Sequence, residues 1–208
     1  MAGNAAHHDN PADHVWDSAS VVPITLTGSG ATTNSPNVTV SGGVVTITAP
    51  GTYRLTGNLT DGQLAVDTNA SGIVRLILAG VSISNSRSAA LYVANADKVM
   101  VVLAAGTTNQ LSDATRYVYP DPQTDEPDAA LFSDANLTIA GEGSLTVRGN
   151  YQDGIASKDG VVITGGRVTV NAADDGIRGK DYVVITGGAI SVNARSDGLK
   201  SSSSSCIL

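Results

Sequence analysis

The sequence predicts an all-β protein that winds as a single-stranded parallel β-helix. Short segments recur along the chain with a spacing of 22 residues, and each repeat contains three apolar clusters of strand length. The 208 residues include 23 glycines for turns and only 4% aromatic residues, so the core depends on stacked aliphatic side chains. No helical period of useful length is present. A short, fixed period of strand-length segments is typical of a solenoid.

The clearest repeats lie between residues 153 and 200. The dipeptide Asp-Gly recurs at positions 153, 175 and 197, and Lys-Asp recurs at positions 158 and 180. In parallel strands, equivalent residues of successive repeats lie above one another at about 4.8 Å and form columns. Ile155, Ile177 and Leu199 form an aliphatic column that predicts part of the core. Solvent-facing columns change from repeat to repeat, whereas the Asp and Lys-Asp columns do not.

Weaker copies of the pattern extend toward the N-terminus and bring the total to about six coils. We expect one domain over residues 31–200, with an insertion at 112–128, because a solenoid shares one continuous core. Residues 1–30 hold all three histidines and few apolar residues, so they predict a flexible leader rather than a His metal site. Residues 201–208 form a serine-rich tail.

The repeat stops after Lys200, where the apolar column ending at Leu199 has no cap. An uncapped solenoid end exposes unpaired strand edges, which natural chains cover. We therefore expect this chain to be truncated at its C-terminus.

Composition excludes several classes of partner. The formal net charge is -7, and the 12 basic residues are scattered, so nucleic acid is a poor partner. The single cysteine, Cys206, lies in the tail and provides neither a disulfide nor a thiol nucleophile in the fold. Neither a signal peptide nor an apolar run long enough to insert into a membrane is present. A surface with few lysines and many Asn, Thr and Ser residues suits a secreted or cell-surface protein. The oligomeric state stays open.

Carboxylates gather where the Asp column meets the preceding insertion. Two neighbouring carboxylates about 4.8 Å apart repel by about 3.5 kcal/mol at an effective dielectric constant of about 20, so a partly buried column needs a cation. Calcium suits such a column, because it takes six to eight oxygen ligands in irregular geometry. Each Asp-Gly pair is also a good turn, and that explanation holds for any single aspartate. The candidate calcium ligands are Glu126, Asp128, Asp153, Asp174, Asp175 and Asp197.

The insertion at 112–128 and the basic residues beside the Asp column suggest a sugar-binding surface. Tyr117 and Tyr119 place two aromatic rings in a long excursion, and such rings stack on sugar faces or anchor loops. Arg178, Lys180 and Lys200 lie near the acidic corner, where a guanidinium or ammonium group could pair with the carboxylate of a uronate.

The stretch from Val66 to Lys200 resembles a bacterial family of carbohydrate-binding domain-containing proteins. The resemblance depends on Gly-Ile-Ala-Ser-Lys-Asp at 154–159 and Asp-Asp-Gly-Ile-Arg-Gly-Lys-Asp-Tyr at 174–182. It implies a right-handed β-helix of the pectate-lyase type, secretion, bound calcium, and binding of cellulose and polygalacturonate without demonstrated lyase activity.

Three functions remain open from the sequence. The first is a non-catalytic, calcium-bearing module that binds cell-wall polysaccharide. The second is a calcium-dependent uronate lyase, in which Arg178, Lys180 or Lys200 removes the C5 proton before β-elimination. The third is a structural or adhesin segment whose repeats only extend. The sequence does not choose the polysaccharide.

Overall fold

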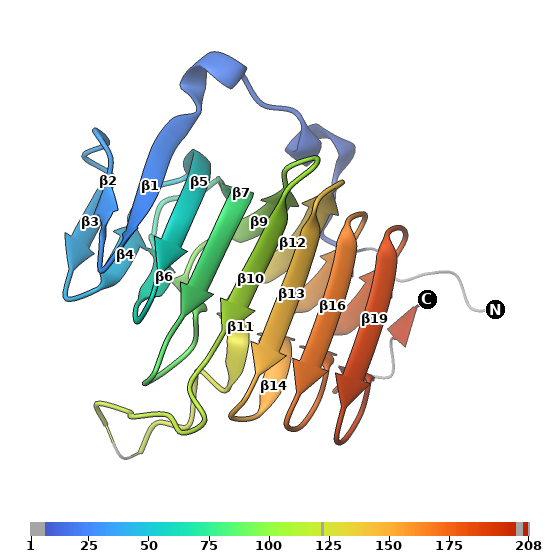
Figure 1. The fold of residues 1–208 in the computed structure, drawn as a ribbon. Coiled ribbons are helices and arrows are strands. Elements are labelled where there is room, and N and C mark those ends of the chain that lie inside the picture. Colours follow the sequence, from blue (N-terminus) through green and yellow to red (C-terminus); the bar gives the residue numbers. More distant parts are fainter. Residues whose placement is uncertain (1–6, 122, 203–205, 208) are drawn as a thin grey trace.

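The computed structural model describes residues 7–121, 123–202 and 206–207. In these residues, two short 3-10 helices, η1 (Pro11–His14) and η2 (Ser18–Ser20), precede 21 strands. The strands form one sheet of 13 strands and a second sheet of eight strands (Figure 1).

The larger sheet is the one that bends round the molecule. Its strands are β1 (Val22–Gly28), β2 (Ala31–Thr32), β5 (Gly51–Leu59), β7 (Ile73–Ser84), β9 (Lys98–Leu103), β10 (Thr108–Ser112), β12 (Asn136–Gly141), β13 (Ser144–Gly149), β15 (Gly160–Ile163), β16 (Arg167–Ala172), β18 (Tyr182–Ile185), β19 (Ala189–Ala194) and β21 (Cys206–Ile207). The smaller sheet consists of β3 (Val38–Ser41), β4 (Val44–Ile47), β6 (Gln63–Asp67), β8 (Leu91–Asn95), β11 (Ala129–Ser133), β14 (Asp153–Ser157), β17 (Ile177–Gly179) and β20 (Leu199–Ser201).

The prediction of a single-stranded parallel β-helix is wrong, although the protein is all-β as expected. Two strands of the same repeat belong to one sheet, because the 12-residue strand β7 pairs with β9 through residues 73–78 and with β10 through residues 82–84. Gly80 lies between these stretches with a φ of 83°, a value that suits glycine. The larger sheet therefore curls like half a barrel. Antiparallel pairs, β1 with β2 and β3 with β4, make both sheets mixed.

The 22-residue repeat sets the register of the parallel strands, as the sequence predicted. Ile155, Ile177 and Leu199 are partners across β14, β17 and β20. Val168 is likewise the partner of Ile190 across β16 and β19. Side chains of one column therefore pack on each other inside the molecule, which is the aliphatic stacking that the repeats require.

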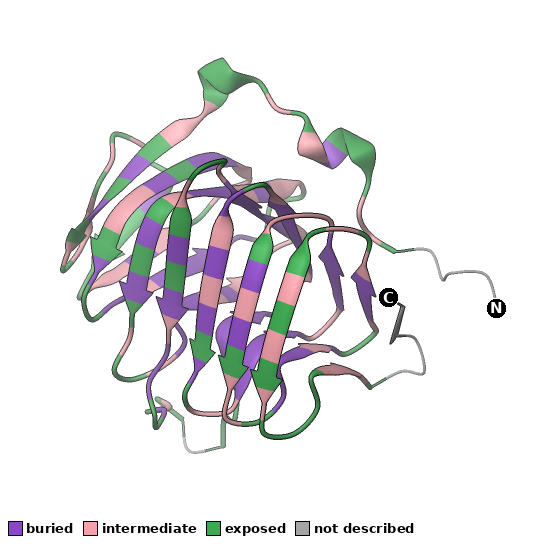
Figure 2. Ribbon diagram, turned by 45° about the vertical axis from the view of Figure 1, so that its right-hand side comes forward, coloured by how far each residue is buried: buried purple, intermediate pink, exposed green. Residues whose placement is uncertain are grey.

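The core lies on the inner side of the curled sheet and is almost entirely aliphatic. Burial alternates along the strands that face it, as on β16, where Val168 and Val170 are fully buried between exposed or half-buried neighbours. In the next repeat Ile190 and Val192 are only partly buried. Figure 2 shows this decrease in burial from β16 to β19.

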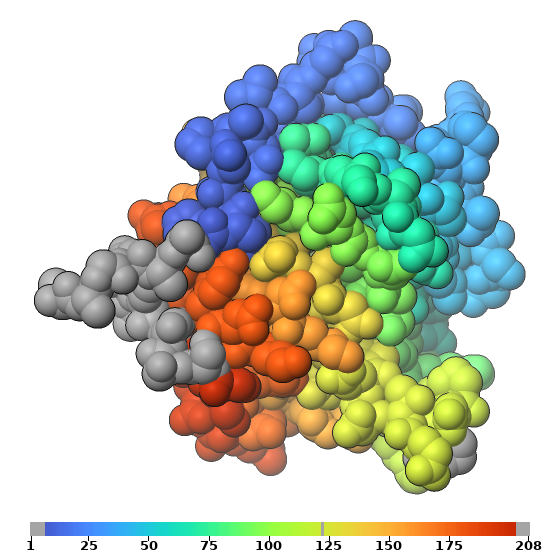
Figure 3. Space-filling model, turned by 180° about the vertical axis from the view of Figure 1, so that it is seen from behind, coloured from blue at the N-terminus to red at the C-terminus, as the bar shows by residue number. Residues whose placement is uncertain are grey.

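Residues 7–21, which we call the N-terminal strap, pack against the outer side of the larger sheet instead of forming the expected flexible leader. Nζ of Lys98 lies 2.6 Å from the carbonyl oxygen of His8 and 2.7 Å from Oδ2 of Asp13. Nε2 of His8 lies 2.9 Å from Oγ1 of Thr138. Burial and the nearby Lys98 lower the pKa of His8 to about 4. Figure 3 shows the strap lying across this side of the sheet. Residues 1–6 of the predicted leader lie outside the described part.

Beyond the strap, β1 extends the larger sheet, so the ordered strands begin before residue 31. At the other end, the backbone of Cys206–Ile207 pairs with β18, while residues 203–205 and 208 of the serine-rich tail lie outside the described part. No helix within the described residues is long and apolar enough to cross a membrane.

Candidate functional site

A column of aspartates runs along one end of the smaller sheet, as the repeat predicted. Asp153 opens β14, and Asp175 and Asp197 lie just before β17 and β20. Oδ1 of Asp153 accepts the N–H of Asp175 at 3.0 Å, and Oδ1 of Asp175 accepts the N–H of Asp197 at 3.1 Å. Each of these two carboxylates therefore links its own repeat to the next one.

The second oxygen of each of these carboxylates binds a basic side chain from the next repeat. Oδ2 of Asp153 lies 2.5 Å from Nε of Arg178, and Oδ2 of Asp175 lies 2.7 Å from Nζ of Lys200. Nη2 of Arg178 also lies 2.5 Å from Oδ2 of Asp128. We call these five residues the Asp–basic ladder. The protein's own cations thus offset part of the repulsion expected within the aspartate column, because three carboxylates of the ladder share two basic side chains.

Burial and ion pairing shift the pKa values of the carboxyl groups in the ladder in opposite directions. Burial raises the pKa of Asp153 despite the hydrogen bond from Arg178, and burial raises the pKa of Asp128 to about 6. Burial also opposes ionisation of Asp175, but the hydrogen bonds from Lys200 and from the N–H of Asp197 outweigh it and lower the pKa.

The two basic residues of the ladder are held in their charged forms. Burial works against the guanidinium of Arg178, but Asp128 and Asp153 outweigh it and raise its pKa. The hydrogen bond to Asp175 raises the pKa of Lys200. A group that keeps its proton is a poor base, so these contacts oppose the proton-abstracting role considered for Arg178 and Lys200. Lys180 is exposed, and its side chain makes no ion pair within the described residues.

Three of the six candidate calcium ligands lie close together. One carboxylate oxygen from each of Asp153, Asp174 and Asp175 lies within 4.8 Å of the others, and Asp174 is exposed. Asp128 is connected to this group through Arg178, and its Oδ1 is buried without a hydrogen-bond partner among the described residues. The side chain of Asp197 is 60% exposed and lies 3.7 Å from Lys200.

The structure places Glu126 in a different ion pair. Nζ of Lys158 lies 2.6 Å from Oε2 of Glu126 and 3.6 Å from Oδ1 of Asp134. Glu126 therefore pairs with the Lys-Asp column of the repeats rather than with the three grouped carboxylates.

The tyrosines of the insertion serve mainly to hold it in place. The loop covers residues 113–128 between β10 and β11, and Tyr117 is only 6% exposed. Its ring stacks on Tyr151 with 4.5 Å between centroids, and its hydroxyl lies 2.7 Å from Oδ2 of Asp113. The hydroxyl of Tyr119 donates to the carbonyl of Pro127 at 2.9 Å. The ring of Tyr117 is therefore buried and cannot stack on a sugar, contrary to our expectation. Tyr119 lies beside it and is half-buried.

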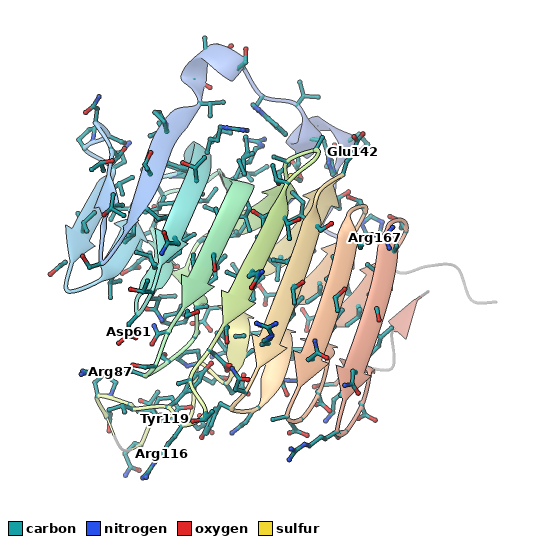
Figure 4. All side chains as sticks on the ribbon, in the orientation of Figure 1. Asp61, Arg87, Arg116, Tyr119, Glu142 and Arg167 are labelled. Carbon is teal, nitrogen blue, oxygen red and sulfur yellow. The ribbon has the colours of Figure 1, made fainter. Side chains whose placement is uncertain are left out.

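A second polar surface, which the sequence did not single out, covers the outer side of seven parallel strands. These strands are neighbours in the order β1, β5, β7, β10, β13, β16 and β19 (Figure 4). One uncharged hydrogen-bonding side chain from each strand lies in register with the next, and all seven are exposed or half-buried. The row consists of Thr27, Asn58, Ser82, Gln110, Thr146, Thr169 and Ser191. We call this side of the sheet the outer polar face.

The only sequence signal for the outer polar face is the alternation of hydroxyl or amide residues with apolar residues inside each strand. Such alternation is also what any half-buried strand shows. Neighbouring members of the row lie between 22 and 36 residues apart, as with Thr169 and Ser191 at one extreme and Gln110 and Thr146 at the other. The unequal spacing hides their alignment until the strands are paired.

Comparison with known proteins shows similarity to carbohydrate-binding domain-containing proteins. A family model described as carbohydrate-binding domain-containing protein matches residues 41–206. A carbohydrate-binding domain-containing protein of Acetivibrio thermocellus is 42% identical over 139 residues, which are 67% of this chain and 49% of that protein. This chain therefore spans about half the length of that relative. A solved structure of the polysaccharide lyase-like protein from C. thermocellum, a gadolinium derivative, superposes with a TM-score of 0.84 and 39% identity, covering 86% of this chain and 73% of the other.

Proposed function

The chain belongs to the family of carbohydrate-binding domain-containing proteins, and on that premise we propose that it binds polysaccharide on the outer polar face without cleaving it. The similarity to a polysaccharide lyase-like protein supports a polysaccharide as the ligand. The ion pairs of Arg178 and Lys200 support binding rather than catalysis, because they hold both groups as cations.

The observation that carries the proposal is the row of seven uncharged side chains. Hydroxyl and amide groups both donate and accept hydrogen bonds, so they match the hydroxyl groups of a sugar. Parallel strands repeat these groups at about 4.8 Å, a spacing close to that of the residues in an extended polysaccharide. A chain that lies across the strands meets one group after another, and its affinity grows with its length because the weak contacts are linked.

We also propose that calcium binds at Asp153, Asp174 and Asp175. The donor set fits a hard cation, since all three residues offer carboxylate oxygens and Asp174 is exposed. Two observations limit the fit: Asp153 and Asp175 already accept hydrogen bonds from basic side chains, and those cations repel a metal ion. This region still has five carboxylates and only two cations. The carboxylates belong to Asp128, Asp153, Asp174, Asp175 and Asp197, and the cations are Arg178 and Lys200.

Calcium titration of the wild-type protein and of Asp174→Asn tests the metal proposal. Asp174 is exposed, and its side chain makes no ion pair with another described residue, so we expect the variant to fold normally and to lose the calcium-dependent rise in melting temperature. Equal melting curves of the wild type in calcium and in chelator would show that the aspartates have a structural role only.

Retention by an insoluble neutral polysaccharide, with Gln110→Ala as the variant, tests the binding proposal. Loss of one neutral hydrogen-bonding group costs about 0.5–1.5 kcal/mol, so affinity should fall by about twofold to tenfold. Gln123→Ala is the matched control, because Gln123 is an exposed glutamine in the loop at 113–128. A wild-type protein that no neutral or acidic polysaccharide retains would refute the function. Accumulation of unsaturated oligosaccharides would replace it with the lyase hypothesis.

A further inference from the structure

A groove with two arginines lies at the end of the outer polar face. It is about 290 Å³ in volume and is formed where β13, β16 and β19 end. Its polar side chains are Arg148, Asn150, Asn171, Asn193 and Arg195. We call it the arginine groove.

The register of the strands explains the shape of the arginine groove. Arg148, Asn171 and Asn193 are in register across the three strands. The residues two positions later in the sequence are Asn150, Ala173 and Arg195, respectively. The small side chain of Ala173 leaves a hollow in the middle, and the two arginines lie at opposite sides of it. Their strands are separated by two spacings of about 4.8 Å, so the guanidinium groups can reach anions roughly 10 Å apart.

The arginine groove continues the surface proposed to bind polysaccharide. Thr146, Thr169 and Ser191 of the outer polar face lie two residues before Arg148, Asn171 and Asn193 on the same strands. Residues two apart on a strand point to the same side of a sheet. A polysaccharide on the outer polar face would therefore reach the groove without leaving the sheet.

The two arginines of the groove differ from the basic residues of the Asp–basic ladder. Within the part of the chain that the structure describes, Arg148 and Arg195 make no ion pair, whereas Arg178 and Lys200 each bind aspartates. The described residues that line the groove include no acidic side chain. In a chain of net charge -7, two guanidinium groups that make no ion pair among the described residues are available to an anionic ligand.

We propose that the arginine groove is a subsite that recognises the carboxylates of an acidic polysaccharide directly, without a metal ion. This rests on the proposed function, since it adds a charge preference to the same surface. Each guanidinium offers two parallel N–H donors that fit a carboxylate, and the ligand itself supplies the missing negative charges. The amides between them hydrogen-bond to sugar hydroxyls. Asn193 already donates to Oδ1 of Asn171 at 3.5 Å, and Nδ2 of Asn150 donates to Oγ of Ser112 at 3.1 Å and to the carbonyl of Asp113 at 2.8 Å. Among the described residues, the side-chain oxygens of Asn150 and Asn193 and the side-chain NH2 of Asn171 stay open to a ligand.

Titration calorimetry with a galacturonate oligosaccharide, in excess chelator, tests the subsite. The wild-type protein should bind the free acid more tightly than the fully methyl-esterified form, which has lost its charge. The double variant Arg148→Gln/Arg195→Gln should bind the free acid at least about tenfold more weakly, since charge-assisted hydrogen bonds are the strong ones. Its affinity for the ester should change little.

Arg167→Gln is the matched control, because Arg167 is exposed at the start of β16, whereas the groove lies at the other end of that strand (Figure 4). It removes the same charge and should leave binding within about twofold of the wild type, as expected for screened long-range charge. The single variants Arg148→Gln and Arg195→Gln should each show part of the loss, which keeps the test valid if the double variant is unstable.

The possible results separate the subsite from the function on which it rests. Equal binding of the free acid by wild type and double variant, equal binding of acid and ester, or an equal loss in Arg167→Gln would each overturn the subsite alone. A wild-type protein that binds neither acid nor ester nor any neutral polymer would overturn both.

Discussion

The Asp–basic ladder and the arginine groove use similar residues in opposite ways. In the ladder, Arg178 lies between Asp128 and Asp153 at 2.5 Å from each, and its side chain is 20% exposed. In the groove, Arg148 and Arg195 are exposed and make no ion pair among the described residues. Arg178 and Lys200, beside the acidic column, are therefore occupied by contacts within the fold, while Arg148 and Arg195, at the end of the row of uncharged side chains, are available to a ligand. The conspicuous charged repeats form ion pairs within the fold, whereas the inconspicuous face is the one that we propose as the polysaccharide-binding surface.

Replacing Arg178 should have the largest effect. Arg178→Met leaves the buried carboxylates of Asp128 and Asp153 without their cation, and breaking a buried pair in this way costs about 3–5 kcal/mol. Urea unfolding at neutral pH measures the loss. The matched variant Arg195→Met should change the free energy of unfolding by less than about 0.5 kcal/mol. Similar small changes in both variants would erase the distinction between ladder and groove.

The free energy of unfolding should depend on pH through the carboxyl group of Asp128. Burial raises its pKa to about 6, against an unfolded value of about 3.9. The folded state therefore binds this proton more tightly, so the stabilisation is complete below about pH 4 and is lost as the pH rises through about 6. The difference in unfolding free energy between wild type and Asp128→Asn should change by up to about 3 kcal/mol over this window. A difference that stays constant from about pH 4 to about pH 7 would contradict a carboxyl group whose ionisation is opposed by burial.

Replacing Lys200 should have a smaller effect than replacing Arg178. The side chain of Lys200 is 42% exposed, so water screens its pair with Asp175. Exposed ion pairs contribute about 0–1 kcal/mol, and Lys200→Met should cost no more than that in urea unfolding. A cost as large as that of Arg178→Met would mean that the ladder acts as one cooperative network.

Replacing the groove arginines should have the smallest effect on stability. Arg148 and Arg195 are exposed and make no ion pair with the described residues, so Arg148→Gln/Arg195→Gln should change the free energy of unfolding by less than about 0.5 kcal/mol. The double variant should therefore change ligand binding and leave stability unchanged. A marked drop in melting temperature without ligand would show that the arginines have a structural role after all.

Sequence and structure agree best where the repeat is regular. The equal spacing of Ile155, Ile177 and Leu199 predicted their stacking, and the strands pair in that register. The aspartate column and the grouping of Asp153 with Asp175 followed from the same period. Glu126 and Tyr117 belong to a long loop with no repeat to fix them, and the structure places the first beside Lys158 and the second inside.

The sequence by itself determined the all-β class, the 22-residue register and the identity of the core columns, because equal repeats must bring equal residues one strand spacing apart. Only the tertiary structure decided that β7 runs through a bend and joins two strands of one repeat into a single curled sheet. It also decided that Arg178 neutralises the aspartates, and that seven polar residues at unequal spacings form one face. These outcomes depend on contacts between segments far apart in the chain, which the local pattern of residues does not specify.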